Sequence, residues 1–392
     1  MIYLFLLLLR IVAFLEGPQK IASFVVVFGL IAFSILKRVD WNRANMISKY
    51  NVYSLLLVLA ILLHGFIFGH IFLRDVAVLL TFWIWFVFTQ IYFKDKSIEK
   101  ILRYLLITFL VYNIANYLFY MLYYSDQQRG VNSIMGMFGV FGYRIYFPLS
   151  SGANIFTSQL GLNALIALYF IKTSPRKIIN IGIYGFYIFM LVLADSRLIL
   201  FFTIMFSFFY WISFKKTIYY LKKYWLGLSI LLLLFMYVFY GTTLFDSIKR
   251  PGERSGEAFT RIDIIGEAIK VIFSDLRILF GYGINGFEAN MADAASKTFE
   301  NERLQTAHNF IFQTMIDFGV IGILVVLAFV FKLLRKLIHL KSYIVTILMV
   351  MILLMGTTES IPTFYSFEPT LFFIALVSLI LVKHEREVPQ LS

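Results

Sequence analysis

Hydrophobic residues in this chain form long runs, which short stretches rich in lysine and arginine separate from one another. Most runs approach the roughly 20 residues that an α-helix needs to cross a bilayer. The pattern therefore predicts an all-α polytopic membrane protein with about twelve transmembrane helices. The predicted helices span 2–15, 19–36, 51–72, 75–93, 101–124, 152–171, 178–194, 197–214, 224–241, 307–331, 342–356 and 367–382.

The basic stretches predict how these helices are oriented. Lysine and arginine in short loops stay on the cytoplasmic side of a membrane. With twelve helices, all the basic clusters fall on the same side as both termini, which predicts an N-in, C-in topology. The clusters begin at Lys37, Lys94, Lys172, Lys215, Lys332 and Lys383. The first run, 2–15, lacks a basic leader and a small-residue cleavage site, so we expect a retained helix rather than a signal peptide.

Two long polar segments, 125–151 and 242–305, then lie on the outer side. The second holds ten acidic and eight basic residues, without the positive excess of the inner loops. From Thr260 onward its apolar residues follow helical spacing, which predicts an amphipathic helix on the outer interface. We expect one transmembrane domain over 1–392, in which 242–305 is a long extracytoplasmic loop between the ninth and tenth helices.

Composition narrows the class of protein. The chain is 60% hydrophobic and 15% charged, with a mean hydropathy of +0.83, which excludes an ordinary soluble domain. The net charge of +13 is spread over short loops instead of a basic domain, so we expect no nucleic-acid partner. There is no cysteine, and the five histidines show no metal-ligand spacing. We therefore predict no metal site and no other cofactor.

The tenth predicted helix carries a polar stripe. Gln305, Asn309, Gln313 and Asp317 recur every four residues and so share one face of an otherwise apolar helix. Such a row is costly at membrane depth unless it faces protein or water. His308 flanks the outer end of the stripe, where an imidazole could take a proton from a sugar hydroxyl. The alternative is an interfacial histidine that only caps the helix.

Arg197 is a second candidate. It follows Asp195 in a tight connection between the seventh and eighth helices, on the outer side, where the positive-inside rule disfavours an arginine. Either Asp195 pairs with it or it binds an anion, and a diphosphate would suit the planar fork of a guanidinium group.

Further single residues are candidates with bland alternatives. Arg254 and Arg261 lie in the long loop, Arg261 at the start of the amphipathic helix, and either could simply be solvated. Arg144 and Asn154 lie around the start of the sixth helix. Glu359, in an outer loop, could hold an arginine or a sugar hydroxyl, although such a residue is more often solvated. The glycines of 281–286 look like a dinucleotide fingerprint but follow no strand, so we interpret them as a tight turn.

The order of these motifs resembles a known family. Ser196-Arg197 opens a helix, Arg261 precedes an amphipathic helix, the glycine-rich 279–283 follows, and Ala307-His308-Asn309 begins a helix that contains the 317–322 segment. In this order, over about residues 140–330, they resemble the O-antigen polymerase and ligase superfamily of bacterial surface polysaccharide assembly. The chain departs from the pattern at two places, with isoleucines at 262, 264 and 265 where a tryptophan is common and leucine at 198 where a small residue is common.

The resemblance implies glycosyl transfer at the outer face of the bacterial cytoplasmic membrane, without nucleotide sugar and without metal. The substrate would be an oligosaccharide on undecaprenyl diphosphate. The resemblance assigns Arg197 and Arg261 to the diphosphate, with Arg254 as a weaker candidate, and His308 to the base or to acceptor positioning. The predicted substrate-binding residues are Arg254, Arg144, Asn154, Asn309 and Gln313. Membrane lipid, a flippase and a chain-length regulator are the expected partners.

Two activities share these motifs, and we favour the first. A polymerase joins repeat units of O-antigen or capsule, whereas an O-antigen ligase transfers the glycan to a lipid acceptor. A composition rich in Ile, Phe, Lys, Tyr and Asn hints at an AT-rich genome and a capsule producer without such an acceptor. A lipid-linked saccharide flippase is the rival of another class, but its polar residues should gather near the bilayer midplane between repeats. A membrane scaffold would leave Arg197 and the polar stripe unexplained.

Overall fold

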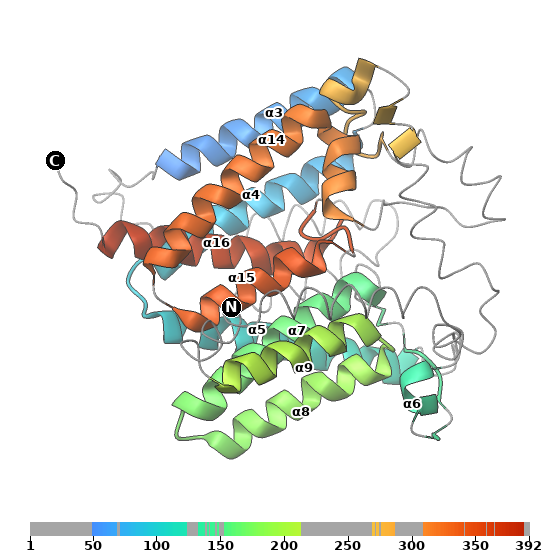
Figure 1. Cartoon of the computed structure of the whole chain (residues 1–392), viewed down its shortest axis with the longest axis vertical. Helices are drawn as coiled ribbons and strands as arrows, with labels where there is room; N and C mark the ends of the chain where they lie inside the picture. The colour runs from blue at the N-terminus through green and yellow to red at the C-terminus, as the bar shows by residue number, and fades with distance from the viewer. Residues whose placement is uncertain are drawn as a thin grey trace, which may run out of the picture.

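The computed structural model describes nine long helices, one short helix and one 3₁₀ turn (Figure 1). The described residues are 49–68, 71–123, 132–137, 139–140, 142–145, 147–148, 153–212, 269–270, 272–273, 276–286, 309–340, 342–357, 359–363 and 365–387. The elements are α3 (Lys49–Phe68), α4 (Leu73–Phe93), α5 (Ile98–Tyr123), α6 (Ser133–Met137), α7 (Ala153–Thr173), α8 (Lys177–Leu193), α9 (Arg197–Ile212), η2 (Leu276–Leu279), α14 (Phe310–His339), α15 (Tyr343–Met355) and α16 (Phe367–Glu387).

Nine of the predicted ranges overlap the long helices, with ends that differ by several residues, and the other three, 2–15, 19–36 and 224–241, lie outside the described residues. The total of twelve helices stays a prediction. The predicted end of the tenth helix at residue 331 is wrong, because α14 continues to His339. Lys332 and Arg335 are good helix formers with exposed side chains, so charge ends the apolar run there without ending the helix.

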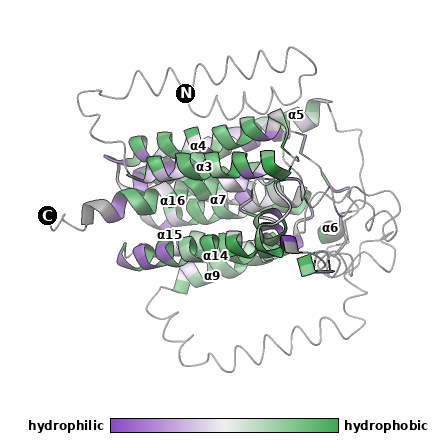
Figure 2. Cartoon of the chain, turned by 90° about the horizontal axis from the view of Figure 1, so that it is seen from above, coloured by the Kyte–Doolittle hydropathy of each residue, from purple (hydrophilic) through white to green (hydrophobic). Residues whose placement is uncertain are grey.

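Length and hydropathy support a helical, multi-pass membrane protein. Five described helices are long and apolar enough to cross a membrane, namely α3, α4, α5, α14 and α16, and α8, α9 and α15 are shorter apolar helices. Figure 2 shows apolar residues along the helices and more hydrophilic residues toward their ends.

Helix α7 lies at the centre of one group of helices, where it contacts α5, α8, α9, α15 and α16. Its side chains Phe156, Leu160 and Phe170 are fully buried. A Cβ on Gly161 would lie 2.6 Å from the hydroxyl of Thr203, so the missing side chain lets α7 and α9 approach closely. Small residues at such contacts are what membrane helix packing requires.

Helix α16 connects this group to a second one that contains α3, α4 and α14. Its contact with α4 includes two polar links, of which the second is fully buried. The indole of Trp85 donates to the carbonyl of Leu371 at 2.8 Å, and the hydroxyls of Thr89 and Ser378 lie 2.7 Å apart. These bonds fix α16 between the two groups.

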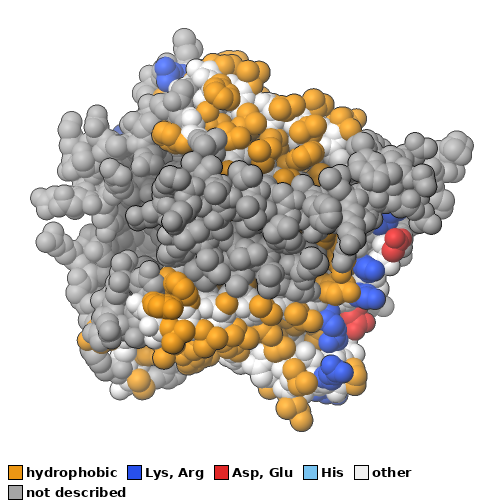
Figure 3. Space-filling model, turned by 180° about the vertical axis from the view of Figure 1, so that it is seen from behind, with side chains coloured by type: hydrophobic (Ala, Val, Ile, Leu, Met, Phe, Trp, Pro, Cys, Tyr) orange, Lys and Arg blue, Asp and Glu red, His pale blue; other side chains and the backbone are white. Residues whose placement is uncertain are grey.

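The described basic clusters share one end of the bundle, which we call the basic end. The ammonium group of Lys383 donates to the carbonyls of Phe93 and Lys96, which ties α16 to the end of α4. Lys336 of α14 donates to the hydroxyl of Tyr50 at 3.0 Å. The space-filling view shows Lys and Arg side chains gathered along one edge, beside a surface that is largely hydrophobic (Figure 3). We call the opposite end, where α14 begins and α6 lies, the loop end (Figure 1).

Candidate active site

The start of α14 is fixed by the side chain of Asn309. Its Oδ1 accepts from the N–H groups of Ile311 at 2.9 Å and Phe312 at 3.1 Å, as an N-cap residue does. Its Nδ2 donates to the carbonyl of Thr357 at 2.8 Å, just beyond the end of α15. Asn309 thus fastens the first turn of α14 to its neighbour, and its predicted contact with sugar stays a prediction.

A chain of hydrogen bonds runs inward from this turn, and we call its five members the Asp317 network. Gln313 donates to Asp317 Oδ1 at 3.0 Å, and the phenol of Tyr365 donates to the same oxygen at 3.3 Å. The backbone N–H of Asn285 donates to the Tyr365 hydroxyl at 2.7 Å. The side chain of Asn285 donates to Asp75 Oδ2 at 2.8 Å. The network therefore joins α14, the α15–α16 loop, the 276–286 turn and the start of α4.

The network explains where the predicted polar stripe faces. Gln313 is 0% exposed and Asp317 is 3% exposed, so this part of the stripe faces protein rather than lipid. Buried polar groups need partners of this kind, because an unpaired one costs several kcal/mol. Loss of solvation raises the pKa of Tyr365 well above its ordinary value, and the neighbouring Asp317 carboxylate raises that pKa further. The phenol therefore keeps its proton and remains a donor. Gln305, the outermost member of the stripe, lies outside the described residues.

The glycine-rich turn docks on α14 through main-chain atoms. A kink at Gly319, where φ is 66°, interrupts the helical hydrogen bonds of α14. The carbonyls of Ile316 and Asp317 instead accept from the N–H groups of Tyr282 at 2.7 Å and Gly283 at 2.9 Å. The predicted tight turn over 281–286 is confirmed, and its partner is the kink in α14.

Two glycines make this docking possible. A Cβ on Gly281 would lie 2.5 Å from the backbone nitrogen of Phe318, and a Cβ on Gly319 would overlap the carbonyl group of Leu279. Both residues also have positive φ, at 76° and 66°, which a side chain disfavours. The two backbones can touch only because neither position has a side chain.

His64 of α3 holds the same turn from the other side. Its Nε2 lies 2.7 Å from the carbonyl of Phe280, and because a carbonyl only accepts, this nitrogen carries the proton. The imidazole packs against the rings of Phe68 and Phe318, with centroids 4.5 and 5.6 Å away. The turn is therefore held between α3 and α14.

A second cluster surrounds the connection between α8 and α9. The Arg144 Nε donates to the carbonyl of Ala194 at 2.9 Å, and Asp195 Oδ1 accepts from the N–H of Ile134 at 3.0 Å. The hydroxyls of Ser196 and Thr157 lie 2.8 Å apart. These contacts fix the backbone immediately before Arg197, the first residue of α9. A preorganised backbone of this kind limits the positions that the guanidinium of Arg197 can reach.

The structure changes the interpretation of two candidates. Arg144 is 6% exposed and supports the α8–α9 connection, so it is more than a solvated surface arginine. Glu359 is 4% exposed, and the expectation that it is solvated is wrong. Its N–H donates to the carbonyl of Met355, which folds the chain back over the end of α15 and buries the side chain.

The predicted site residues are only partly within the described chain. Those that are described lie at the loop end, where helices α9 and α14 begin; they are Arg144, Arg197, Asn309 and Gln313. Asn154 lies in the first turn of α7, and its side chain is not among those described. The remaining candidates, Arg254, Arg261 and His308, lie outside the described residues. That Arg197, Arg261 and His308 converge stays a prediction.

Sequence reasoning missed four residues of this region. It considered His64 only as a metal ligand, and it did not single out Asp75, Asn285 or Tyr365. Asp75 had a usable signal, since a lone acid at the start of an apolar span is a candidate for a specific contact. Tyr365 had none, because the residues that it joins are far apart in the chain. Within the described ranges, no three His, Asp or Glu side chains are grouped as a metal site requires.

Comparison with known proteins agrees with the motif order. Residues 182–327 match a family model described as O-Antigen ligase. No curated protein matches the chain. The matched segment begins in α8 and ends in α14, and so includes Arg197, the glycine-rich turn, Asn309 and the kink at Gly319. Over residues 182–327 the match confirms the predicted relationship to the O-antigen polymerase and ligase superfamily.

Proposed function

We propose that the protein is a polysaccharide polymerase, which joins oligosaccharide repeat units carried on undecaprenyl diphosphate. The reaction takes place at the outer face of the cytoplasmic membrane, which in this proposal is the loop end of the bundle. One observation carries the proposal: the segment that matches the O-antigen ligase family holds a buried, hydrogen-bonded polar framework at one end of an apolar bundle. The basic clusters at the opposite end fit a cytoplasmic location.

The proposed chemistry is glycosyl transfer between two lipid-linked saccharides. A hydroxyl of the acceptor sugar attacks the anomeric carbon of the donor, and the bond between that carbon and the diphosphate oxygen breaks. His308 takes the hydroxyl proton, as a general base with a pKa near neutrality can do. Arg197 and Arg261, with Arg254 in a lesser role, stabilise the charge that develops on the leaving diphosphate.

The contacts of the described residues support a positioning role for the rest of α14. Asn309 follows His308 in the sequence and caps the helix, and Gln313 is held by Asp317. Both residues act through the placement of the first turn of α14 in this proposal, and not by contact with the reacting atoms. Arg144 acts in the same way on Arg197, because it holds the connection that precedes α9.

A ligase is the second candidate, since the matched family model is described as O-Antigen ligase. A flippase is less well supported. Three polar side chains meet near the middle of α7. Asn113 and Gln159 hydrogen-bond to each other through both amide groups, and Asn163 donates to Gln159. All three side chains are 0% exposed. A transport pathway at that depth would need polar groups that solvent or substrate can reach.

The test uses purified full-length protein and an undecaprenyl-diphosphate-linked oligosaccharide. A ladder of products that differ by one repeat unit is expected for the polymerase. Transfer of a single glycan to a different lipid acceptor would indicate the ligase instead. If neither product forms under conditions in which the protein remains monodisperse, the enzymatic proposal is wrong.

His308→Ala should abolish product formation, because no other group is proposed to take the hydroxyl proton. A matched control exists at the far end of α14, since His339 is an exposed histidine at the basic end. His339→Ala should retain the wild-type rate. The measurement is initial rate at equal amounts of membrane-extracted protein, and full activity in His308→Ala would contradict the assigned role.

A further inference from the structure

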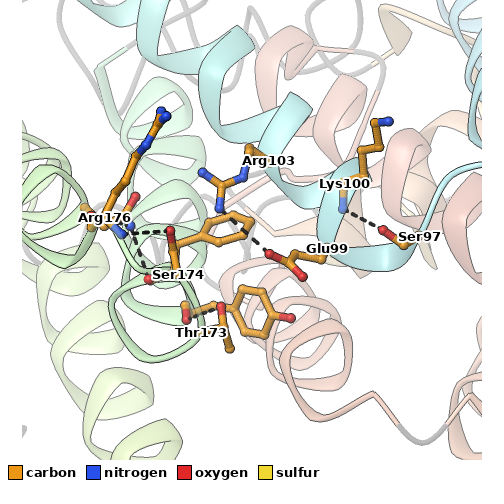
Figure 4. Close-up of polar contacts among 10 residues, drawn as sticks. Ser97, Glu99, Lys100, Arg103, Thr173, Ser174 and Arg176 are labelled. Carbon is orange, nitrogen blue, oxygen red and sulfur yellow. Dashed lines mark hydrogen bonds and ion pairs between the residues drawn. The ribbon is translucent and has the colours of Figure 1, made fainter.

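The basic end of the bundle contains a cluster of basic side chains that the proposed reaction does not use. It lies where the α4–α5 turn meets the α7–α8 turn (Figure 4). From 94 to 103 and from 172 to 177 the chain has seven basic and two acidic residues, a surplus of five positive charges. The positive-inside rule accounts for the presence of these charges at one end. It does not account for the geometry that holds two of them.

Arg103 is placed by an aromatic ring. Its guanidinium carbon lies 4.2 Å from the ring centroid of Phe170, a cation–π contact that holds the group over the ring. Its contact with Glu99 is long, at 3.8 Å, and the two side chains are 36% and 51% exposed. An exposed pair of this kind contributes little, so the charge of Arg103 remains available to an outside anion.

Arg176 is placed by the turn between α7 and α8. The amide of Asn180, itself 3% exposed, donates both to the carbonyl of Phe170 at 3.2 Å and to that of Arg176 at 2.9 Å. The N–H of Arg176 also donates to the hydroxyl of Ser174 at 3.3 Å. The buried side-chain amide of Asn180 therefore holds the backbone both at Phe170, whose ring contacts Arg103, and at Arg176.

Arg103 of α5 and Arg176 of the α7–α8 turn are both at this junction. Figure 4 shows the side chain of Arg103 between those of Arg176 and Lys100. Within the described part of the chain, Arg176 takes part in no ion pair. Two guanidinium forks at one junction provide several N–H donors for phosphate oxygens.

Apolar side chains lie directly beside these cations. Ile107, one turn along α5 from Arg103, is 41% exposed. Ile178 and Ile179, which follow Arg176 at the start of α8, are 85% and 59% exposed. A ligand with a phosphate next to long hydrocarbon chains matches this combination of cations and exposed isoleucines. A soluble phosphate compound would have no use for the apolar part.

We propose that Arg103 and Arg176 form a specific site for the phosphodiester head group of an anionic phospholipid in the membrane leaflet at the basic end. The guanidinium groups bind the phosphate, Lys100 adds to the positive field, and the acyl chains lie along Ile107 and Ile178. An anionic head group is favoured over a zwitterionic one, because the surplus of positive charge repels a choline group. The site is independent of the glycosyl transfer proposed above.

The experiment measures lipid binding to the purified full-length protein by native mass spectrometry, with phosphatidylglycerol and phosphatidylcholine of the same acyl chains as probes. Wild-type protein should bind phosphatidylglycerol at least tenfold more tightly than phosphatidylcholine. The Arg103→Gln, Arg176→Gln double variant should lose most of that preference, by about tenfold, because each basic residue near a membrane surface contributes on the order of 1 kcal/mol.

A matched control removes the same two charges at the same end of the bundle. Lys332 and Arg335 are exposed residues of α14, and the Lys332→Gln, Arg335→Gln variant should keep the wild-type preference. Equal losses in the two double variants would mean diffuse surface charge and would overturn the site, as would a wild-type protein without preference.

Two single variants separate binding from folding. Arg176 is exposed, so Arg176→Gln leaves the packing intact and should by itself reduce the preference severalfold. Arg103→Lys keeps the charge but loses the planar fork, and a reduced preference is expected there too. If Arg176→Gln and Arg103→Lys both bind like wild type, the proposed geometry is wrong.

Discussion

Asn309 shows what a single residue in this protein can do without touching substrate. Sequence reasoning placed it in a substrate-binding stripe because it recurs at a spacing of four with Gln313. The structure gives both amides partners within the protein, as a helix cap and as a donor to Asp317. At this scale, the polar residues at the start of α14 determine where the helix begins and how it is oriented.

Asn309→Ala should lower both stability and rate. Loss of the cap costs about 1–2 kcal/mol, which should lower the melting temperature by several degrees. If the first turn of α14 positions the base, a small displacement should also reduce kcat by tenfold to a hundredfold, with little change in KM. Thermal melting and initial rates with the lipid-linked substrate are the measurements.

The conservative variant is the control for Asn309. Asn309→Asp keeps a good N-cap acceptor but loses the donor to Thr357. Its melting temperature should therefore lie between those of the wild type and Asn309→Ala. If Asn309→Ala changes KM alone, direct contact with the sugar is the better interpretation.

At the scale of elements, the contact between the glycine-rich turn and the kink in α14 is the feature that joins distant parts of the chain. The turn is held by the main chain of α14, by His64 of α3 and by the Asp317 network. The glycine-rich segment, one of the motifs whose order resembles the family, is therefore a structural joint between elements. Its two glycines are required by contact distance and by positive φ.

Gly281→Ala should disrupt this joint. The added methyl group would overlap the backbone of α14 at Phe318, where no flexible side chain can move aside, so we expect a loss of about 2 kcal/mol or more. Gly182→Ala is the matched control, because a Cβ on this glycine of α8 meets nothing within 4 Å. That change should be neutral or slightly stabilising. Thermal melting of both variants decides the matter, and equal melting temperatures would show that the joint tolerates a side chain.

For the whole molecule, hydrophobic runs bounded by charge predicted the described helices well. Spanning length and apolar composition are properties of each segment by itself, so they can be read without knowing the neighbours. The end of α14 was missed because a helix can continue past the apolar run, as it does beyond Lys332. The Asp317 network was missed for a different reason: Tyr365 reaches Asp317, and Asn285 reaches Tyr365 and Asp75, only after four elements have packed together.

The predicted topology can be tested without first removing native cysteines, because the chain contains none. Single cysteines introduced at positions 255 and 258, in the 242–305 segment, should react with a membrane-impermeant maleimide in intact cells. Ser97→Cys, at the basic end, should react only after the membrane has been permeabilised. If Ser97→Cys reacts in intact cells and the cysteines at 255 and 258 react only after permeabilisation, the predicted orientation is wrong. The proposed reaction at the outer face would then be wrong as well.

A joint built from main-chain atoms has a consequence for how such enzymes can diversify. The bonds from Tyr282 and Gly283 to α14 depend on peptide groups and on the absence of two side chains, and not on the identity of the residues around them. Under the proposed function, stretches farther from the joint than Asn285 can vary with the sugar that is accepted, while the anchor stays the same. If the proposed polymerase function holds, outer loops exchanged with a related protein to change glycan specificity should be cut outside residues 279–286, with Gly319 and Tyr365 left in place.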